Sequence, residues 1–565
     1  MKTRNKLYDK SRLRLLCLLT ALLGLFGAGQ TWAGNPTTLT VGGTDVLNGG
    51  YWTTDAESGT LTEASADNYN VYYDGNGTLT LKDATINGTD IIGHVGAGIY
   101  AEGDLTIVLE GSSTVTGVQD PNGESQSIRV SGNLTIQGGG SLNAQGDDTS
   151  DGSSSGIFVI GSFTQQGGSV TAIGGNVSAN QTSEGLYVYG STVTVQSGTL
   201  TATGGDTSGS SYGISASGTV TVGSAAVTAT GGSGNASYGL YIDSSSPSVT
   251  ISGGGSLTAR SGSATSEAGG IYVYNIYNSA GSVTVGDNST LLANSVILYD
   301  QSYAEKPLAP TGYGSWLIYG QSNQTSAVGG SYTLKENITI PSGAVVTIPE
   351  GSTLTIPEDK TLTADANQLV VNGELVLEGT FDNAKELEGS GNLVLGEITL
   401  TDDEGMDEYK DYQLKLKSKK VTYVRALSDN SQYGTICLPF VPTSVAGGQV
   451  TYYQVLELES DVITLVETDF EAGKPLFYRT SGTGDITFSA ESAAGVELVT
   501  IPATDNFMVG TMREVIPNAG YFLKNNNFYP ITDGVQVKVK PFRAYVKGQN
   551  DASQASVMSV NVARP

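Results

Sequence analysis

The chain has 565 residues, and its 55 acidic residues outnumber 28 basic ones to give a formal net charge of −27 at pH 7. A chain of this length exceeds one hydrophobic core, so we expect several modules. The negative charge is concentrated in residues 34–409, which hold 7 Lys and Arg against 39 Asp and Glu. Such an acidic surface disfavours nucleic acid and anionic lipid as partners.

Residues 1–33 are predicted to be a secretory signal peptide. Basic residues precede an apolar run from Leu15 to Phe26, and Thr31 and Ala33 supply the small residues of a cleavage site after Ala33. No later stretch approaches the roughly 18 apolar residues of a membrane-spanning helix. Cys437 is then the only cysteine left, so no internal disulfide is expected. We therefore expect a secreted or outer-surface protein.

Residues 34–97 are predicted to form an N-terminal cap and a first coil, because VYYDGNGTLTLKDATING (71–88) is a degenerate copy of a repeat that follows. Residues 98–300 contain seven copies of that repeat, each about 29 residues long. The copies open with a small residue and an aliphatic one: Gly98-Ile99, Ser127-Ile128, Gly156-Ile157, Gly185-Leu186, Gly213-Ile214, Gly239-Leu240 and Gly270-Ile271. Three short period-2 segments per copy, with no helical segment, predict an all-β parallel β-helix whose coils stack on one another.

The alternation within each copy separates inward from outward residues. The aliphatic opening residues are expected to point inward, as are Leu105, Leu134, Phe163 and their equivalents in the second strand. The outward positions of the opening strand are rich in aromatics, and they are the candidate glycan-binding residues: Tyr100, Phe158, Tyr187, Tyr189, Tyr241, Tyr272 and Tyr274. Exposed rings at the strand spacing of about 4.8 Å suit stacking on sugar rings. Alternatively, the tyrosines stack on each other as ordinary residues of a sheet face.

Threonines form two further outward columns. One follows the second strand from Thr106 to Thr284, and the other is predicted to run from Thr116 through Thr171 to Thr258. Flat threonine arrays also resemble the faces of ice-binding β-helices. Threonine suits any solvated sheet face, however, and most copies have Asp, Asn or Ser where the first threonine of a T-x-T pair should be.

After Asn294 the repeat period is lost. Residues 301–407 are predicted to be a transition followed by a β-solenoid with shorter coils, because short strands there alternate with Pro/Gly turns. In residues 408–565 the Gly and Ser density falls, and strand-like segments predict a C-terminal β-sandwich of jelly-roll type. Cys437, in the apolar segment TICLPF, is expected to be a small buried hydrophobe rather than a nucleophile, since His94 is the only histidine.

Repeat lines such as GAGIYAEGDLTIVLEG and VTISGGGSLTARSG resemble the β-helical carbohydrate-binding-domain proteins secreted by gut anaerobic bacteria, over roughly residues 70–300. The resemblance implies a right-handed β-helix at the cell surface that binds polysaccharide with calcium. The segments YGTICLPF, AGKPLFYR and PFRAYV look like the terminal β-sandwich found on many secreted surface proteins of the same bacteria.

Catalytic chemistry is poorly represented in the repeats. Between residues 90 and 305 the only Lys or Arg are Arg129 and Arg260, more than four coils apart, whereas a lyase needs a base and a group that neutralises a uronate. A hydrolase needs carboxylates that converge on one face, and no such pair is evident. The loop GDDTSDG offers Asp147, Asp148 and Asp151 as candidate calcium ligands, with a solvated turn as the alternative.

The sequence therefore predicts a secreted or cell-surface, non-enzymatic carbohydrate-binding or adhesion protein. Its partner would be a polysaccharide or a host or bacterial surface glycan, with calcium as the one candidate cofactor. One alternative is a structural spacer or a protein-binding adhesin without glycan specificity. A second is a polysaccharide-degrading β-helix enzyme.

Overall fold

The structure is a computed structural model that describes residues 34–89, 96–275, 280–302, 304–320, 326–427, 432–459, 462–482, 484–524, 526–532, 536–548 and 557–563. The predicted signal peptide and His94 lie outside these residues. The chain divides into two compact units, residues up to 289 with 296–311, and residues 290–295 with those from 312 onward. The described residues are all-β, with two short 3-10 helices and no α-helix, and none of their helices has the length and apolar character to cross a membrane.

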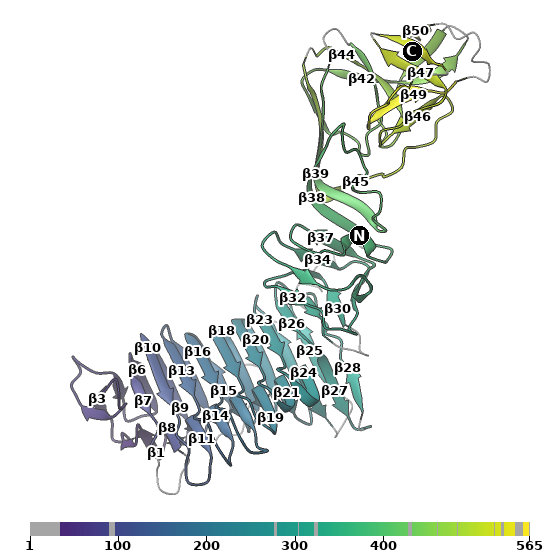
Figure 1. Ribbon diagram of the computed structural model, residues 1–565. Helices are drawn as coiled ribbons and strands as arrows, with labels where there is room; N and C mark the ends of the chain where they lie inside the picture. Colours follow the sequence, from purple (N-terminus) through teal and green to yellow (C-terminus); the bar gives the residue numbers. More distant parts are fainter. Residues whose placement is uncertain are drawn as a thin grey trace, which may run out of the picture. The chain divides into compact units, whose positions relative to one another are not determined.

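The first unit is a parallel β-solenoid of about eight turns (Figure 1). Its opening strands form one sheet: β8 (Gly96–Glu102), β11 (Ser125–Val130), β14 (Ser154–Val159), β17 (Ser183–Val188), β19 (Ser210–Ala216), β21 (Gly234–Asp243), β24 (Ala264–Asn275) and β27 (Val296–Asp300). The predicted inward column is confirmed, since Ile128 pairs with Ile157 and Leu186 with Ile214, and all four are fully buried. β27 pairs in parallel with β24 and adds an eighth strand beyond the seven predicted copies.

The other two segments of each copy also stack in parallel. The second segments are β9 (Leu105–Glu110), β12 (Leu134–Gly138), β15 (Phe163–Gln165), β22 (Ser248–Ile251) and β25 (Ser282–Val285); the third are β10 (Ser112–Thr116), β13 (Ser141–Gln145), β16 (Ser169–Ile173) and β23 (Ser256–Arg260). β18 (Thr192–Thr203) and β20 (Thr219–Thr230) cover both segments of their copies. One predicted register is wrong: Asn143 pairs with Thr114 and Thr171, so the second threonine column includes Thr114, whereas Thr116 lies beside Gln145.

Both edges of the opening sheet end in antiparallel strands. β1 (Thr38–Val41) pairs with β8 and with β2 (Thr44–Asp45), and β28 (Glu305–Pro307) pairs with β27. The degenerate copy at 71–88 contributes β6 (Thr78–Lys82) and β7 (Thr85–Asn87), which stack in parallel on β9 and β10. Its first segment, β5 (Val71–Tyr73), instead pairs antiparallel with β6 and with β3 (Gly50–Thr54), which also pairs with β4 (Leu61–Glu63).

The glycine that opens most copies lies where the backbone of another strand comes closest. A Cβ atom at Gly213 would lie 2.6 Å from the carbonyl oxygen of Gly239 and nearer still to the backbone nitrogen of Thr230. The pairing of β17 with β19 includes Glu184 with Tyr212 and Leu186 with Ile214 but omits this glycine. The opening strand is therefore irregular at one residue, and strict alternation does not hold across it.

The second unit begins with a solenoid of shorter coils. Its strands form three parallel ladders, and within each ladder a new strand begins about every 20 residues. The first ladder contains β30 (Ser326–Gly329), β33 (Val346–Ile348) and β36 (Leu369–Val371). The second contains β31 (Ser331–Thr333), β34 (Thr353–Ile356), β37 (Glu374–Leu377), β38 (Asn392–Leu400) and β39 (Lys415–Arg425), and the third contains β32 (Ile338–Thr339) and β35 (Leu362–Thr363). β26 (Thr290–Ala293) and β29 (Ser315–Ile318) precede them, and the 3-10 helices η1 (Ala366–Gln368) and η2 (Ala384–Glu386) lie between strands. The strands within each of these ladders stack in parallel.

Two sheets follow around a common core. One contains β40 (Tyr433–Ile436), β44 (Leu476–Thr480), β42 (Val450–Leu458), β43 (Val462–Glu467) and β50 (Ser559–Val562); the other contains β46 (Met508–Thr511), β49 (Arg543–Val546), β47 (Gly520–Lys524) and β48 (Asn527–Ile531). Phe477 of the first sheet and Phe528 of the second meet in that core, with ring centroids 5.1 Å apart. β39 pairs antiparallel with β45 (Ile486–Leu498), and β45 also pairs antiparallel with β41 (Ser444–Ala446). The more specific jelly-roll topology stays a prediction.

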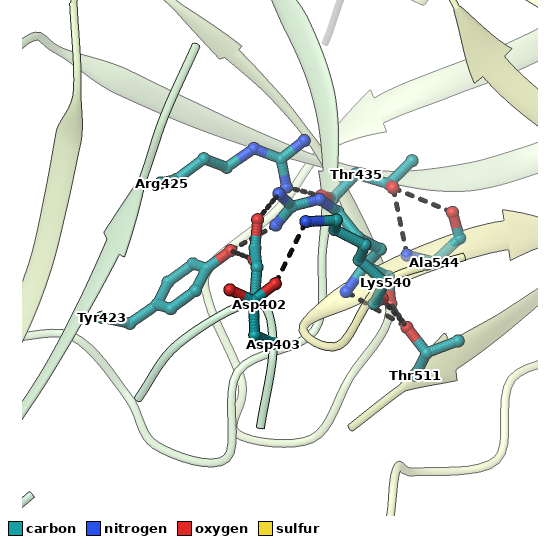
Figure 2. A network of polar contacts seen from close by, with 9 residues as sticks. Asp402, Asp403, Tyr423, Arg425, Thr435, Thr511, Lys540 and Ala544 are labelled. Carbon is teal, nitrogen blue, oxygen red and sulfur yellow. Dashed lines mark hydrogen bonds and ion pairs between the residues drawn. The ribbon is translucent and has the colours of Figure 1, made fainter. Parts of the chain in front are cut away.

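A polar network joins Asp402, at the end of β38, to the strands that follow (Figure 2). The Tyr423 hydroxyl donates to Asp402 Oδ1 at 2.8 Å, Arg543 Nη2 lies 2.5 Å from Asp402 Oδ2, and Arg543 Nη1 donates to the Tyr423 hydroxyl. Burial, together with the charge of Arg543, lowers the pKa of Arg425 beside this network. Cys437 is fully buried, as expected, and burial raises the pKa of its thiol to about 12.

Candidate functional site

Six tyrosines of the first unit pack into a continuous group over β19, β21, β24 and β27. We call this group the tyrosine platform: Tyr212, Tyr238, Tyr241, Tyr272, Tyr274 and Tyr299. The ring planes of several neighbours are nearly parallel, because the parallel register places these residues at matching positions of adjacent strands. The interplanar angle is 15° for Tyr212 and Tyr238, 11° for Tyr241 and Tyr272, and 7° for Tyr274 and Tyr299.

The exposure of the predicted aromatic residues is uneven. Tyr189 is 61% exposed, and the side chains of Phe158, Tyr187, Tyr241 and Tyr274 are half-buried. The prediction of an exposed ladder is wrong for the remaining two members. Tyr100 is 5% exposed, and Tyr272, packed between Tyr238 and Tyr241, is 3% exposed.

The aromatic column is also interrupted along the solenoid. Ser215 occupies the position between Tyr187 and Tyr241, so Phe158, Tyr187 and Tyr189 form a smaller group of edge-on contacts. Arg129 stacks at the other end of this smaller group, with its guanidinium carbon 4.7 Å from the Phe158 ring centroid. Among the described residues of the opening sheet, the larger continuous aromatic surface therefore lies over β19 to β27.

Sequence reasoning missed Tyr212, Tyr238 and Tyr299. Tyr212 and Tyr238 immediately precede the opening glycine, three residues before the outward position, so strict alternation assigns them to the opposite face. The irregularity at the glycine brings them back to the outer face, where Tyr212 lies 5.1 Å from Tyr241. The signal available in the sequence was the recurrence of Tyr-Gly-aliphatic in two successive copies. Tyr299 follows Asn294, where the repeat period is lost.

Carboxylates line the tyrosine platform. The Tyr238 hydroxyl donates to Glu267 Oε2 at 2.5 Å, and burial, then this bond, raise the pKa of Tyr238. Burial likewise raises the pKa of Tyr241 and Tyr272, so these phenols remain neutral donors and acceptors at physiological pH. Burial also raises the pKa of Asp243, which pairs with Tyr274 in the sheet. The platform thus combines apolar ring surface with neutral and acidic hydrogen-bonding groups.

Glu184 lies in the same row of the sheet as Tyr212 and Tyr238, and it is 3% exposed. The Ser155 hydroxyl donates to its Oε2 at 3.0 Å. Burial raises the pKa of Glu184 to about 7, although hydrogen bonds from Thr182 and Ser155 oppose the shift. Glu184 is therefore an enclosed carboxyl group that changes charge near neutral pH.

Replacement of Glu184 by Gln is expected to change the pH dependence of stability. The unfolded carboxyl titrates near 4.5 and the folded one near 7, so the stabilisation from the protonated form is complete below about pH 4.5 and is lost as pH rises to 7. Between these pH values the wild type should lose on the order of 3 kcal/mol relative to Glu184→Gln. Urea unfolding of both proteins from pH 4 to 8 measures the difference. Parallel stability profiles would contradict a titrating buried Glu184.

The three aspartates proposed as calcium ligands each accept hydrogen bonds from neighbouring groups. Asp148 Oδ1 accepts the backbone N–H of Asn176 at 2.7 Å, in a ladder that continues when Asn176 Oδ1 accepts the N–H of Asp206. Asp147 Oδ1 accepts the N–H of Asp148, and Asp151 accepts a hydrogen bond from Ser150. Within the described ranges, no group of three or more His, Cys, Asp or Glu residues is placed to hold a metal ion. The loop is a hydrogen-bonded turn between coils.

No family model matches the chain, and no curated protein matches it. Among solved structures, a tailspike protein double mutant of E. coli bacteriophage HK620 is 11% identical, covering 75% of this chain and 87% of that chain with a TM-score of 0.22. The tailspike protein of the same bacteriophage in complex with pentasaccharide is 12% identical, covering 84% and 87%, with a TM-score of 0.20. Similarity at this level carries no functional argument, so function rests on the geometry of this chain.

Proposed function

We propose that the protein is a secreted or cell-surface carbohydrate-binding protein that holds a glycan on the tyrosine platform. The supporting observation is the continuous ring cluster from Tyr212 to Tyr299, in which pairs with nearly parallel ring planes are joined by tilted contacts of 43° to 51°. Its half-buried members present ring surface beside hydroxyls and carboxylates. The rings support one another, so a ligand would immobilise few free side chains on binding. Sugar rings offer the apolar faces and the hydroxyl edges that such a surface accommodates.

Binding without catalysis is the better-supported form of this proposal. Among the described residues, Glu184 and Asp243 are the carboxyl groups whose pKa is raised. Glu184 lies in the same row of the sheet as Tyr238, two strands away, and Asp243 lies five residues beyond Tyr238 along its strand. At the usual strand spacing and rise per residue, the backbones at Glu184 and Asp243 are therefore roughly 19 Å apart. Glycoside hydrolysis requires two carboxyl groups within roughly 5 to 10 Å. Glu184 is also enclosed, whereas a catalytic acid must reach the glycosidic oxygen.

A structural spacer or protein-binding adhesin is the second candidate, because the platform tyrosines bury much of one another's surface. Tyr238 and Tyr272 are each 3% exposed, as interior residues of a purely structural stack would be. Under this alternative, loss of the exposed rings would leave glycan interaction unchanged.

An affinity screen of the full chain against immobilised polysaccharides, with calcium and with chelator, tests the proposal. Combined replacement of Tyr212, Tyr241 and Tyr274 by Ala should weaken binding by at least about 100-fold, since each aromatic anchor contributes about 1–2 kcal/mol. Tyr238 and Tyr272 are retained to preserve the buried part of the stack.

The matched control is Tyr313→Ala, which removes a tyrosine that is 92% exposed and lies outside the platform. Its affinity should equal that of the wild type. Equal glycan affinity of the triple variant and the wild type would instead support the spacer or protein adhesin. Chelator sensitivity would indicate that binding requires calcium.

A further inference from the structure

The loops that lead into the opening strands shorten beside the tyrosine platform. The connection between β16 and β17 has nine residues (174–182), whereas the connection between β20 and β21 has three (231–233). A hollow of about 580 Å³ lies at these shorter loops, within the range of about 300 to 1,000 Å³ typical of small-molecule sites. Its polar lining comes from successive coils: Asp206, Thr207, Ser233, Asn235, Ser263 and Thr265. We call it the loop groove.

Hydrogen bonds hold the polar groups of the loop groove in fixed orientations. Asp206 Oδ1 accepts the backbone N–H of Ser233 at 2.7 Å, and Asn235 Oδ1 accepts the Thr265 hydroxyl at 3.1 Å. The second bond directs the Asn235 amide so that its NH₂ group is the side left to donate to a ligand. Ordered hydroxyl, amide and carboxylate groups are the partners that sugar hydroxyls require.

The loop groove meets the tyrosine platform within two residues of the chain. Asn235 directly precedes Ala236, which packs in the platform core and pairs with Glu267. Thr265 lies two residues before Glu267, whose carboxylate accepts the Tyr238 hydroxyl. One oligosaccharide can therefore contact both surfaces if it runs along the strand direction.

The charge of this region selects against acidic sugars. Asp206 lines the loop groove and Glu267 adjoins it, whereas the groove lining contains neither Lys nor Arg. A uronate or sialate carboxylate would approach like charges with no cation to compensate it. Uncharged sugars meet hydrogen-bonding groups here together with the apolar surface of Val177 and Ala264.

We propose that the loop groove is a second sugar subsite, which binds an uncharged unit of a glycan whose adjacent units stack on the tyrosine platform. The glycan would then run parallel to strands β19, β21 and β24, and perpendicular to the direction in which the coils stack. This inference rests on the proposed function, because it assigns a direction and a charge class to the same ligand.

Affinity measurements on neutral polysaccharides (β-glucan, galactomannan and xylan) and anionic ones (polygalacturonate and alginate) test the subsite. The double variant Asn235→Ala, Thr265→Ala should bind the preferred neutral polysaccharide at least tenfold more weakly than the wild type. The matched control is Asn143→Ala, Thr171→Ala, which removes the same two side-chain types from an outward column of the third segment. The control should bind as the wild type does.

The outcomes separate the two proposals. If the triple tyrosine variant loses polysaccharide binding and the groove variant keeps it, the proposed subsite is wrong and the proposed function still stands. Preference for the anionic polysaccharides would overturn the charge class. Absence of binding to every polysaccharide by the folded protein would overturn both, and circular dichroism of each variant confirms that loss of binding is not loss of folding.

Discussion

Replacement of Gly213 by Val is expected to lower the unfolding free energy of the first unit by about 4 kcal/mol. The new Cβ would overlap the backbone of Gly239 in the next copy and that of Thr230 at the end of its own copy, and backbone cannot turn aside as a side chain can. Overpacking a core costs about 1–3 kcal/mol, and a clash with backbone costs more. Urea unfolding followed by circular dichroism measures the change.

Gly139→Val is the matched control, since a Cβ at this exposed glycine of the same unit meets no atom within 4 Å. Its unfolding free energy should stay within about 0.5 kcal/mol of the wild type.

Ser127 occupies the opening position in one copy, where its hydroxyl donates to the carbonyl of Val115 at 2.8 Å. Gly213→Val with the stability of the control would show that neighbouring coils separate easily, contrary to close stacking.

Replacement of Asp402 by Asn is expected to destabilise the second unit by about 3 kcal/mol. Asp402 contacts both Arg543 and Tyr423, and Arg425 lies beside them, so the variant leaves two guanidinium groups near each other without this carboxylate. Loss of one partner from a buried ion pair costs about 3–5 kcal/mol, and the partial exposure of Asp402 places the effect at the lower end. Hydrogen exchange of β39 and β49 in urea reports this change.

An exposed ion pair in the same unit provides the comparison. Glu514 lies 2.7 Å from Lys538, and both side chains are about half exposed. Glu514→Gln should cost less than about 1 kcal/mol, because solvent screens such pairs. Equal effects of the two substitutions would mean that the Asp402 network contributes no more than a surface contact.

The repeat sequence was sufficient to predict the solenoid and most of its interior. The inward columns at Ile128, Ile157 and Leu186 follow directly from period-2 alternation in copies of similar length, and their register follows from the copies themselves. The N-terminal cap was harder to predict. β5 has the sequence of an opening strand, but it pairs with β6, and β1 is the strand that pairs with the free edge of β8.

The candidate site was only partly predictable, for two physical reasons. The irregularity at the opening glycine shifts the alternation, so strict alternation does not identify Tyr238 as an outward residue although it lies at the centre of the platform. Exposure depends on neighbouring rings, which is why Tyr272 is buried and Tyr189 is exposed although both were expected to face outward. The loop groove depends on differences in length between adjacent loops, which no single copy reveals.

The antiparallel strands at both edges of the opening sheet have a consequence for self-association. A repeat that stacks on its own neighbours would also accept the repeat of another molecule, and successive additions would give an open-ended filament. β1 and β28 run against the direction of the coils, and each is at most four residues long. The outermost strands are β2, whose two residues run parallel to the coils, and β28, whose three residues run antiparallel to them. An incoming chain therefore meets no edge strand longer than three residues, and so short an edge lets this sheet be present at high local concentration without polymerising.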